Sequence, residues 1–214
     1  MSKSGNEMSF FDHLEELRWR LFRTGGVVLL FALLAFTFKG FVFDNIIFAP
    51  TYRNFIAYEY WCMFIQSIGV SKELCLGNLD FTIINTEMAG QFMVHIKIAM
   101  ALGVIIAFPY LVWEIWLFIS PGLHMKEVKA SRKAILGSAV LFFIGILFGY
   151  YVLTPFSLDF LSKYNVSNIV TNTFTLTNYI SFISTLVLAS GIMFQLPMAV
   201  FLLAKMNIIT ARMM

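Results

Sequence analysis

The chain has 214 residues, of which 59% are hydrophobic and only 13% are charged. That composition is too apolar for an ordinary soluble domain and is typical of an integral membrane protein. The formal net charge of +3 is small, and no basic stripe with interleaved aromatic residues indicates a nucleic-acid surface. Composition and charge therefore argue against both a water-soluble fold and a nucleic-acid-binding protein.

The first element expected along the chain is an amphipathic helix over Ser9–Arg23. Ser9 and Asp12 fit a capping box at its start. Leucines at helical spacing form one face of this helix, and acidic and basic residues occupy the other faces. We expect it to lie at the membrane interface before the chain turns into lipid.

Four stretches are apolar enough to cross a bilayer, whose hydrocarbon core requires about 20 residues of helix. They cover residues 24–43, 93–118, 134–155 and 179–204. The positive-inside rule places the N-terminus in the cytoplasm, because that orientation leaves few cations outside, namely Lys39, Arg53, Lys72 and Lys163. The predicted fold class is all-α, with residues 1–214 forming one polytopic transmembrane bundle.

In this topology residues 44–92 form a long periplasmic segment. The segment is too apolar in places for an unstructured linker, so short helices packed on the outer face are expected. It contains Cys62 and Cys75, which either form a disulfide in an oxidising compartment or remain separate thiols in apolar surroundings. Two cysteines without histidine partners are a poor zinc site.

A second group of informative residues lies at the inner end of the second span. Pro109 is expected to kink this span, and Pro121 is expected to end it. Glu114 lies one to two turns before that end, where it either reaches toward water or extends an acidic binding surface. We favour the binding surface, because Trp113 and Trp116 already supply interfacial anchoring.

Three blocks of the sequence resemble the TatC family, the multispanning core subunit of the twin-arginine protein translocase. The first block is HLEELRWRL at residues 13–21. The second covers residues 108–127 and contains Trp116, Phe118, Pro121, Gly122 and Leu123. The third consists of GYYVLTPF at residues 149–156 and FQLPMAVFLL at residues 194–203. Together the blocks span most of the chain.

The resemblance implies a receptor in the bacterial inner membrane that binds twin-arginine signal peptides at its cytoplasmic face and helps to move folded proteins across. It implies small single-span partners of the TatA and TatB type, self-association, contact with lipid, and no cofactor. The family's six spans also imply that the last two are missing here. The matched signal-binding positions are Glu16, Arg18, Phe118, Pro121, Leu123 and Glu127, and the matched structural or assembly positions are Pro50, Tyr150, Pro155 and Gln195.

The chemistry of the two matched glutamates suits that role, because carboxylates accept bidentate, charge-assisted hydrogen bonds from guanidinium groups. Plainer interpretations exist for both residues. Glu16 could pair with Arg20 one helical turn later, and Glu127 could simply favour the first turn of a helix. Gln195 stands where many relatives have a glutamate, and its amide could serve only to bond a neighbouring helix.

Other classes of function fit the sequence less well. The motifs G-x-S-x-G, H-E-x-x-H and Walker A are absent from the sequence, so an enzyme is not expected. A small-solute transporter or channel subunit would be expected to carry mid-membrane charges, and a non-transporting membrane scaffold would tolerate loss of both glutamates. Neither class explains acidic residues gathered at one membrane face.

Overall fold

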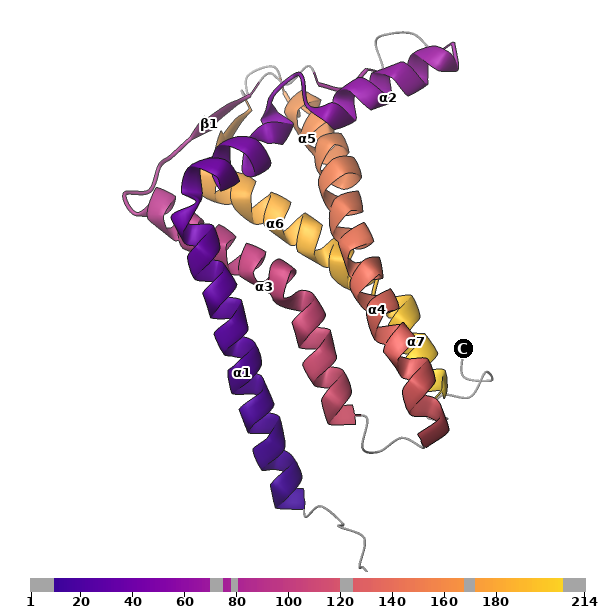
Figure 1. Ribbon diagram of the computed structural model, residues 1–214. Helices are drawn as coiled ribbons and strands as arrows, with labels where there is room; N and C mark the ends of the chain where they lie inside the picture. The colour runs from indigo at the N-terminus through magenta and orange to yellow at the C-terminus, as the bar shows by residue number, and fades with distance from the viewer. Residues whose placement is uncertain (1–9, 70–74, 78–80, 120–124, 168–171, 206–214) are drawn as a thin grey trace, which may run out of the picture.

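The computed structural model describes residues 10–69, 75–77, 81–119, 125–167 and 172–205. Within these residues, four helical runs are long and apolar enough to cross a membrane: Leu14–Thr37, Gly90–Phe118, Ile135–Lys163 and Leu176–Val200. They form an elongated bundle capped at one end by short elements (Figure 1). The predicted transmembrane helical bundle with four spans is confirmed.

Helix α1 (Phe10–Thr37) runs without a break from the amphipathic segment into the first span. The expected separate interfacial helix is therefore wrong. No proline interrupts the sequence between Phe10 and Thr37, so nothing removes a backbone hydrogen bond where a turn would be needed. The helix ends at Thr37, before the predicted residue 43, and a π-helical segment η1 (Phe41–Ile47) follows.

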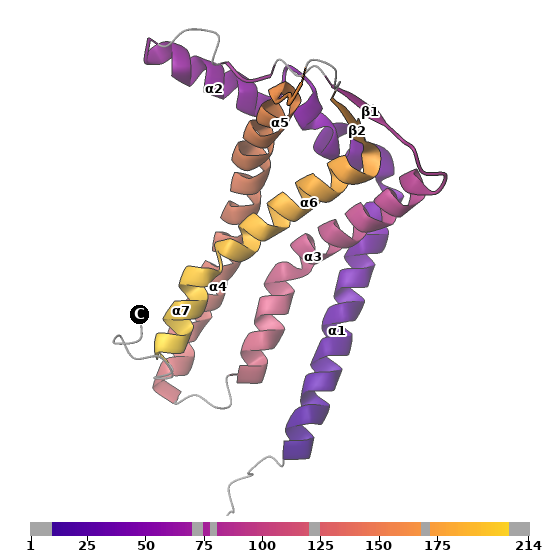
Figure 2. The same cartoon turned by 180° about the vertical axis from the view of Figure 1, so that it is seen from behind.

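Helix α3 (Gly90–Ile119) forms the second span and packs along α1. It contains Pro109 and bends part way along its length (Figures 1 and 2), as expected for an internal proline. Gly103 permits the close approach of the two helices, because a Cβ there would lie 2.7 Å from the carbonyl oxygen of Val28.

The third span is longer than predicted. Helix α4 (Met125–Phe148), a π-helical turn η5 (Gly149–Leu153) and helix α5 (Thr154–Lys163) follow one another directly. The predicted span ends at residue 155, because the stretch from 156 to 178 is rich in Ser, Thr and Asn and is expected to form a turn. Pro155 instead occupies the first turn of α5, where proline is tolerated, and the Thr154 hydroxyl donates to the Gly149 carbonyl at 2.9 Å.

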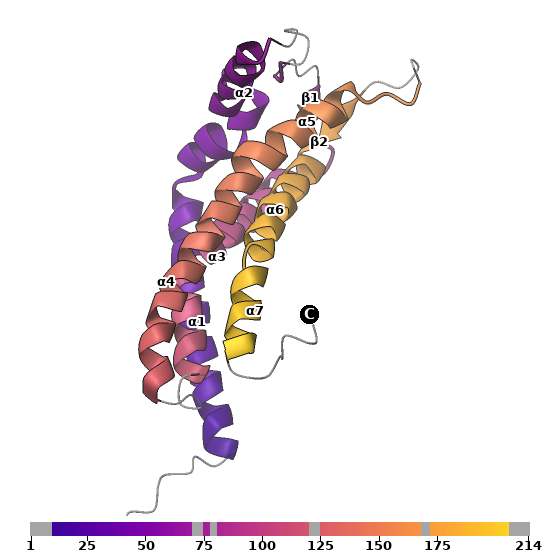
Figure 3. The same cartoon turned by 90° about the vertical axis from the view of Figure 1, so that its right-hand side faces the viewer.

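The fourth span consists of α6 (Leu176–Met193) and α7 (Leu196–Lys205), separated by a short break. Helix α6 packs against both α3 and α4, and the side view shows α6 running alongside α4 (Figure 3). A Cβ on Gly145 of α4 would lie 2.9 Å from the Cα of Gly191 on α6. This small residue therefore serves packing within the chain.

Short elements cap the bundle at the end that we call the disulfide end, because it carries Cys62 and Cys75. They are the 3-10 helix η2 (Ala49–Thr51), helix α2 (Ile56–Ser67), and strands β1 (Thr82–Ile84) and β2 (Thr173–Thr175). The strands pair in parallel, with Ile83 opposite Phe174. Each leads into a span, α3 or α6, and these two spans run in the same direction, which explains the parallel pairing (Figure 2).

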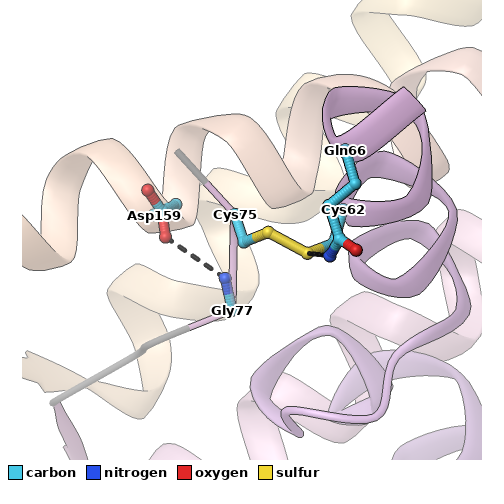
Figure 4. Close-up of a disulfide and its surroundings, with 5 residues drawn as sticks. All are labelled: Cys62, Gln66, Cys75, Gly77 and Asp159. Carbon is cyan, nitrogen blue, oxygen red and sulfur yellow. Dashed lines mark hydrogen bonds between the residues drawn. A yellow bond between two sulfur atoms is a disulfide. The ribbon is translucent and has the colours of Figure 1, made fainter. Parts of the chain in front are cut away.

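A disulfide joins Cys62 on α2 to Cys75, with an S–S distance of 1.92 Å (Figure 4). Two residues later, the backbone N–H of Gly77 donates to Oδ1 of Asp159 on α5 at 3.3 Å. The other Asp159 oxygen accepts from Lys163 at 2.8 Å. The disulfide therefore ties the segment after α2 back to α2 itself, and the Asp159 contact attaches the same segment to the end of the third span.

Tyr58 on α2 is buried beneath this segment. Gly77 has a φ of +107° and packs against the Tyr58 ring, so both its conformation and its surroundings require glycine. Burial raises the pKa of the Tyr58 phenol, and the negative charge of Asp159 raises it further. The phenol therefore stays protonated and donates to the Pro50 carbonyl at 2.8 Å.

The main apolar core lies directly below the cap, between η1, α3, α5 and α6. Tyr179 spans it, donating to the Ile47 carbonyl at 2.9 Å. This core fastens the disulfide end of the bundle. Its buried members are Val42, Ile47, Val94, Ile98, Leu158, Tyr179, Ile180, Ile183 and Val187.

Candidate functional site

A cluster of charged side chains joins α1 to α3 at the opposite end of the bundle, which we call the charged end. Arg20 donates from both Nε and Nη2 to Oε1 of Glu16, one turn earlier on α1, with Nε at 3.1 Å. Its remaining nitrogen, Nη1, donates to Oε2 of Glu114 on α3 at 3.0 Å. Arg23 lies 3.4 Å from the other Glu114 oxygen. Arg20 therefore links the two carboxylates.

Glu114 is the most buried member of this charged cluster, with a side chain only 5% exposed. Besides the two arginines, it accepts a hydrogen bond of 2.6 Å from the Tyr110 hydroxyl, one turn earlier on α3. A buried carboxylate is stable only when cations and donors compensate for its lost hydration. Glu114 meets that condition within the chain, since each of its oxygens has a partner.

An apolar groove with a cavity of about 210 Å³ adjoins the charged cluster. It combines carboxylate and guanidinium groups with leucine, isoleucine and phenylalanine side chains, so a partner that binds there needs both charged and apolar parts. Among the described residues, no group of three or more His, Cys, Asp or Glu could hold a metal ion. The groove is lined by Leu17, Arg20, Leu21, Thr24, Leu111, Glu114, Ile115 and Phe118.

The other residues predicted to bind a signal peptide fall in different places. Phe118 lines the groove, whereas Arg18 is exposed on α1 away from the groove lining. Pro121 and Leu123 lie outside the described residues. Glu127 belongs to α4, but its side chain also lies outside the described part of the chain. The described structure thus brings Glu16, Glu114 and Phe118 together.

Three of the predicted structural positions support the disulfide end. Pro50 is buried and its carbonyl holds the Tyr58 hydroxyl. Tyr150 donates to the Ile46 carbonyl at 2.6 Å, which connects the third span to η1. Pro155 is also buried, at the start of α5.

Gln195, the fourth structural position, lies at the break between α6 and α7 and bonds to α4. Its Oε1 accepts from the Ser138 hydroxyl at 2.6 Å, and its Nε2 donates to the Ser138 carbonyl at 2.8 Å. Both halves of the amide are therefore used within the chain. An ionised glutamate could accept the first bond but could not donate the second.

The sequence did not identify Arg20, Arg23 and Tyr110 as partners of Glu114. Helical spacing indicates Arg20 only as a partner of Glu16, because the two residues are one turn apart. The sequence does indicate that these residues lie at the same depth in the membrane. Both arginines precede the apolar part of the first span, and Glu114 lies near the end of the second. Charges at the same depth on antiparallel neighbouring helices are candidates for pairing.

Fold and site together define a polytopic helical membrane protein with an ion-paired groove at one end and a covalently linked cap at the other. The family described as Sec-independent protein translocase protein (TatC) matches residues 12–214. The chain belongs to this TatC family. It is accordingly a core subunit of the twin-arginine translocase, a multi-pass inner-membrane protein that functions in protein transport with other Tat subunits and is not an enzyme.

Individual relatives show the same similarity along nearly the whole chain. The TatC protein of Blattabacterium sp. subsp. Periplaneta americana is 33% identical over 211 residues, covering 98% of this chain and 79% of the relative. That of Listeria innocua is 31% identical, covering 95% and 72%. A crystal structure of the twin-arginine translocase receptor TatC matches with a TM-score of 0.71 at 31% identity, covering 92% of this chain and 77% of that chain.

Proposed function

We propose that this subunit is the receptor for twin-arginine signal peptides and that it binds them in the groove at the charged end. The observation that supports this proposal is the hydrogen bonding of the two Glu16 carboxylate oxygens. Oε1 accepts both hydrogen bonds from Arg20, while Oε2 makes no hydrogen bond to any described residue. The side chain is 30% exposed, so an incoming guanidinium can reach the open oxygen.

Glu114 has a different role in this proposal. Its oxygens are occupied by Arg20, Arg23 and Tyr110, so it positions Arg20 and does not itself receive a peptide arginine. With Arg20 held from α3, Glu16 keeps one rotamer and one open oxygen. The second peptide arginine is assigned to Glu127, on the strength of the sequence resemblance and of the chemistry of carboxylates toward guanidinium groups.

The apolar part of the groove accounts for the rest of a signal peptide. A hydrophobic segment that follows the paired arginines would contact the apolar lining of the cavity. Arg20, the partner of Glu16, belongs to the same lining. The apolar residues concerned are Leu17, Leu21, Ile115 and Phe118. Burying apolar side chains yields about 25 cal/mol for each Å² removed from water. Charge pairing gives specificity for arginine, and this apolar contact adds affinity.

The proposal places the charged end in the cytoplasm, as the positive-inside rule predicts, and the disulfide end in the periplasm, where cysteines can be oxidised. It includes TatA- and TatB-type single-span subunits as partners and self-association of the chain. Labelling of introduced cysteines from either side of the membrane tests the orientation.

The test of the receptor role is crosslinking of a signal peptide to a photoreactive residue introduced at Phe118. Membranes with the unchanged chain are compared with Glu16→Gln and with the control Glu15→Gln, an exposed neighbour on α1. A peptide whose two arginines are both lysine is run in parallel. We expect an arginine-dependent crosslink that weakens about tenfold in Glu16→Gln, because a charge-assisted hydrogen bond is lost, and persists in Glu15→Gln.

The alternatives give different results in the same experiment. If the arginine and lysine peptides crosslink equally, or if Glu16→Gln behaves like Glu15→Gln, the assignment of Glu16 is refuted. If correctly inserted protein crosslinks to neither peptide, the receptor role is refuted, and a scaffold role within the translocase becomes the better description of this chain.

A further inference from the structure

We propose that the cavity beside Lys39, at the disulfide end, is a binding site for one anionic phospholipid. The site lies at the far end of the bundle from the charged groove and takes no part in signal-peptide recognition. It has a volume of about 570 Å³. Its lining comes from the end of the first span, η1, the start of α3 and the start of α6, and consists of Lys39, Gly40, Phe43, Phe48, Gln91, Phe92, Val94, His95 and Leu176.

The position of the cavity corresponds to the headgroup level of a membrane. Its walls come from the points where three spans end or begin, at Thr37, Gly90 and Leu176. A ligand there has one side toward the water and the other toward the acyl chains. A soluble anion gains nothing from a site that faces the acyl chains. A phospholipid of that leaflet already has its headgroup at this depth and its acyl chains on the apolar side.

Lys39 supplies the charge. It is exposed, between α1 and η1, and makes no hydrogen bond or ion pair with any described residue. The nearby Asp44 on η1 is also exposed but does not come within ion-pair distance of Lys39. Gln91, in the first turn of α3, has no hydrogen bond to the described residues either. An ammonium and an amide N–H₂ are thus both available to phosphate oxygens.

The aromatic wall of the cavity is rigidly held. The His95 ring stacks on Phe36 with centroids 3.8 Å apart and meets Phe43 edge-on at 5.6 Å. Its Nε2 lies 3.1 Å from the Phe36 carbonyl oxygen, which can only accept, so this nitrogen carries the proton. Phe43 also contacts Phe48 at 6.1 Å. The wall offers an acyl chain a preformed apolar surface.

The combination of these features distinguishes an anionic phospholipid from other lipids. Zwitterionic headgroups bring their own cation, which would meet Lys39 with the same sign of charge, whereas an anionic headgroup brings only the phosphate. Basic pockets between transmembrane helices bind anionic headgroups in this way. The four-carbon stem of Lys39 can lie along the aromatic wall while its ammonium reaches the phosphate.

The test uses the full chain in detergent, titrated separately with phosphatidylglycerol and phosphatidylcholine, with the first bound lipid counted by native mass spectrometry. We expect phosphatidylglycerol to bind about tenfold tighter, the ratio for one charge-assisted hydrogen bond. Lys39→Gln should abolish most of that preference. Lys163→Gln is the matched control, because it removes the same charge from the disulfide end, outside the cavity.

The other possible results of this experiment either support or overturn the lipid site. Lys39→Arg should keep the preference, because it keeps the positive charge, and Lys39→Met removes the charge with a similar stem if Lys39→Gln fails to fold. Equal binding of the two lipids, or equal losses in Lys39→Gln and Lys163→Gln, would overturn the site. Displacement of phosphatidylglycerol by an equal concentration of glycerol phosphate would show an anion site without acyl-chain contact, and would overturn it as well.

Discussion

Replacing Glu114 by glutamine should lower the free energy of unfolding by about 2 kcal/mol, because it removes the charge that links α3 to α1. The main contribution is the 3.0 Å bond to Arg20, whose side chain is 17% exposed; a hydrogen bond to a charged group contributes about 1.5–3 kcal/mol. The Arg23 pair adds only a few tenths, since Arg23 is 62% exposed. The Tyr110 bond survives, because an amide carbonyl also accepts.

A double-mutant cycle measures the link directly. Unfolding of Glu114→Gln, Arg20→Gln and the double variant is followed by circular dichroism in mixed micelles of increasing denaturing detergent. Arg20→Gln also loses its bonds to Glu16, but that loss occurs with and without Glu114 and cancels in the cycle. We expect a coupling energy of about 1.5–2 kcal/mol.

The control for this prediction is Glu15→Gln, which removes a carboxylate from the exposed side of α1 and should change the unfolding free energy by less than about 0.5 kcal/mol. A coupling energy below about 0.5 kcal/mol would show that Arg20 and Glu114 contribute independently. The link between α1 and α3 inferred from their distance would then be refuted.

Three further predictions concern packing, the disulfide and the intramembrane amide. Gly103→Leu should separate α1 from α3 and lower the unfolding free energy by about 3 kcal/mol, measured by the same detergent titration; unchanged stability would contradict the close packing. Replacing both Cys62 and Cys75 by serine should lower the thermal midpoint under oxidising conditions and abolish its sensitivity to dithiothreitol, because a 13-residue separation is closed by the bond; a midpoint insensitive to reductant in the unchanged chain would refute this. Gln195→Leu should cost about 1 kcal/mol by leaving Ser138 without its partner, and equal stability of Gln195→Glu would show that the donated bond is unimportant.

The spans could be predicted from sequence because they depend on local properties. A run of apolar residues long enough for the bilayer is visible without knowledge of its neighbours. The ends were harder to place. The predicted third span stops at Pro155, although proline is compatible with the first turn of a helix, and α5 continues from there to Lys163. Strands β1 and β2 contain three residues each, too few for an alternating pattern to be recognised.

The sequence could not predict the part of the site that depends on contacts between distant residues. The pair Glu16–Arg20 follows from helical spacing, but Arg20 and Glu114 are 94 residues apart, and their contact depends on the register between α1 and α3. Gly103 helps to set that register through its contact with α1. For the same reason, the bonding of Cys62 to Cys75 stayed an open alternative until the two were placed in space.

The two ends of the molecule differ in how firmly their helices are joined. At the disulfide end the apolar core and the paired strands connect the spans, and the disulfide holds the cap together. Toward the charged end, α3 and α4 diverge (Figures 1 and 2). Phe108 of α3 and Phe142 of α4 stack on each other, with ring centroids 3.6 Å apart. The third and fourth spans are joined to each other through Ser138 and Gln195, so together they behave as one lever that pivots at the disulfide end. Because the third span is about 44 Å long at 1.5 Å per residue, a tilt of about 5° would move its far end by about 4 Å, so small rearrangements under the cap are magnified at the face where the groove lies.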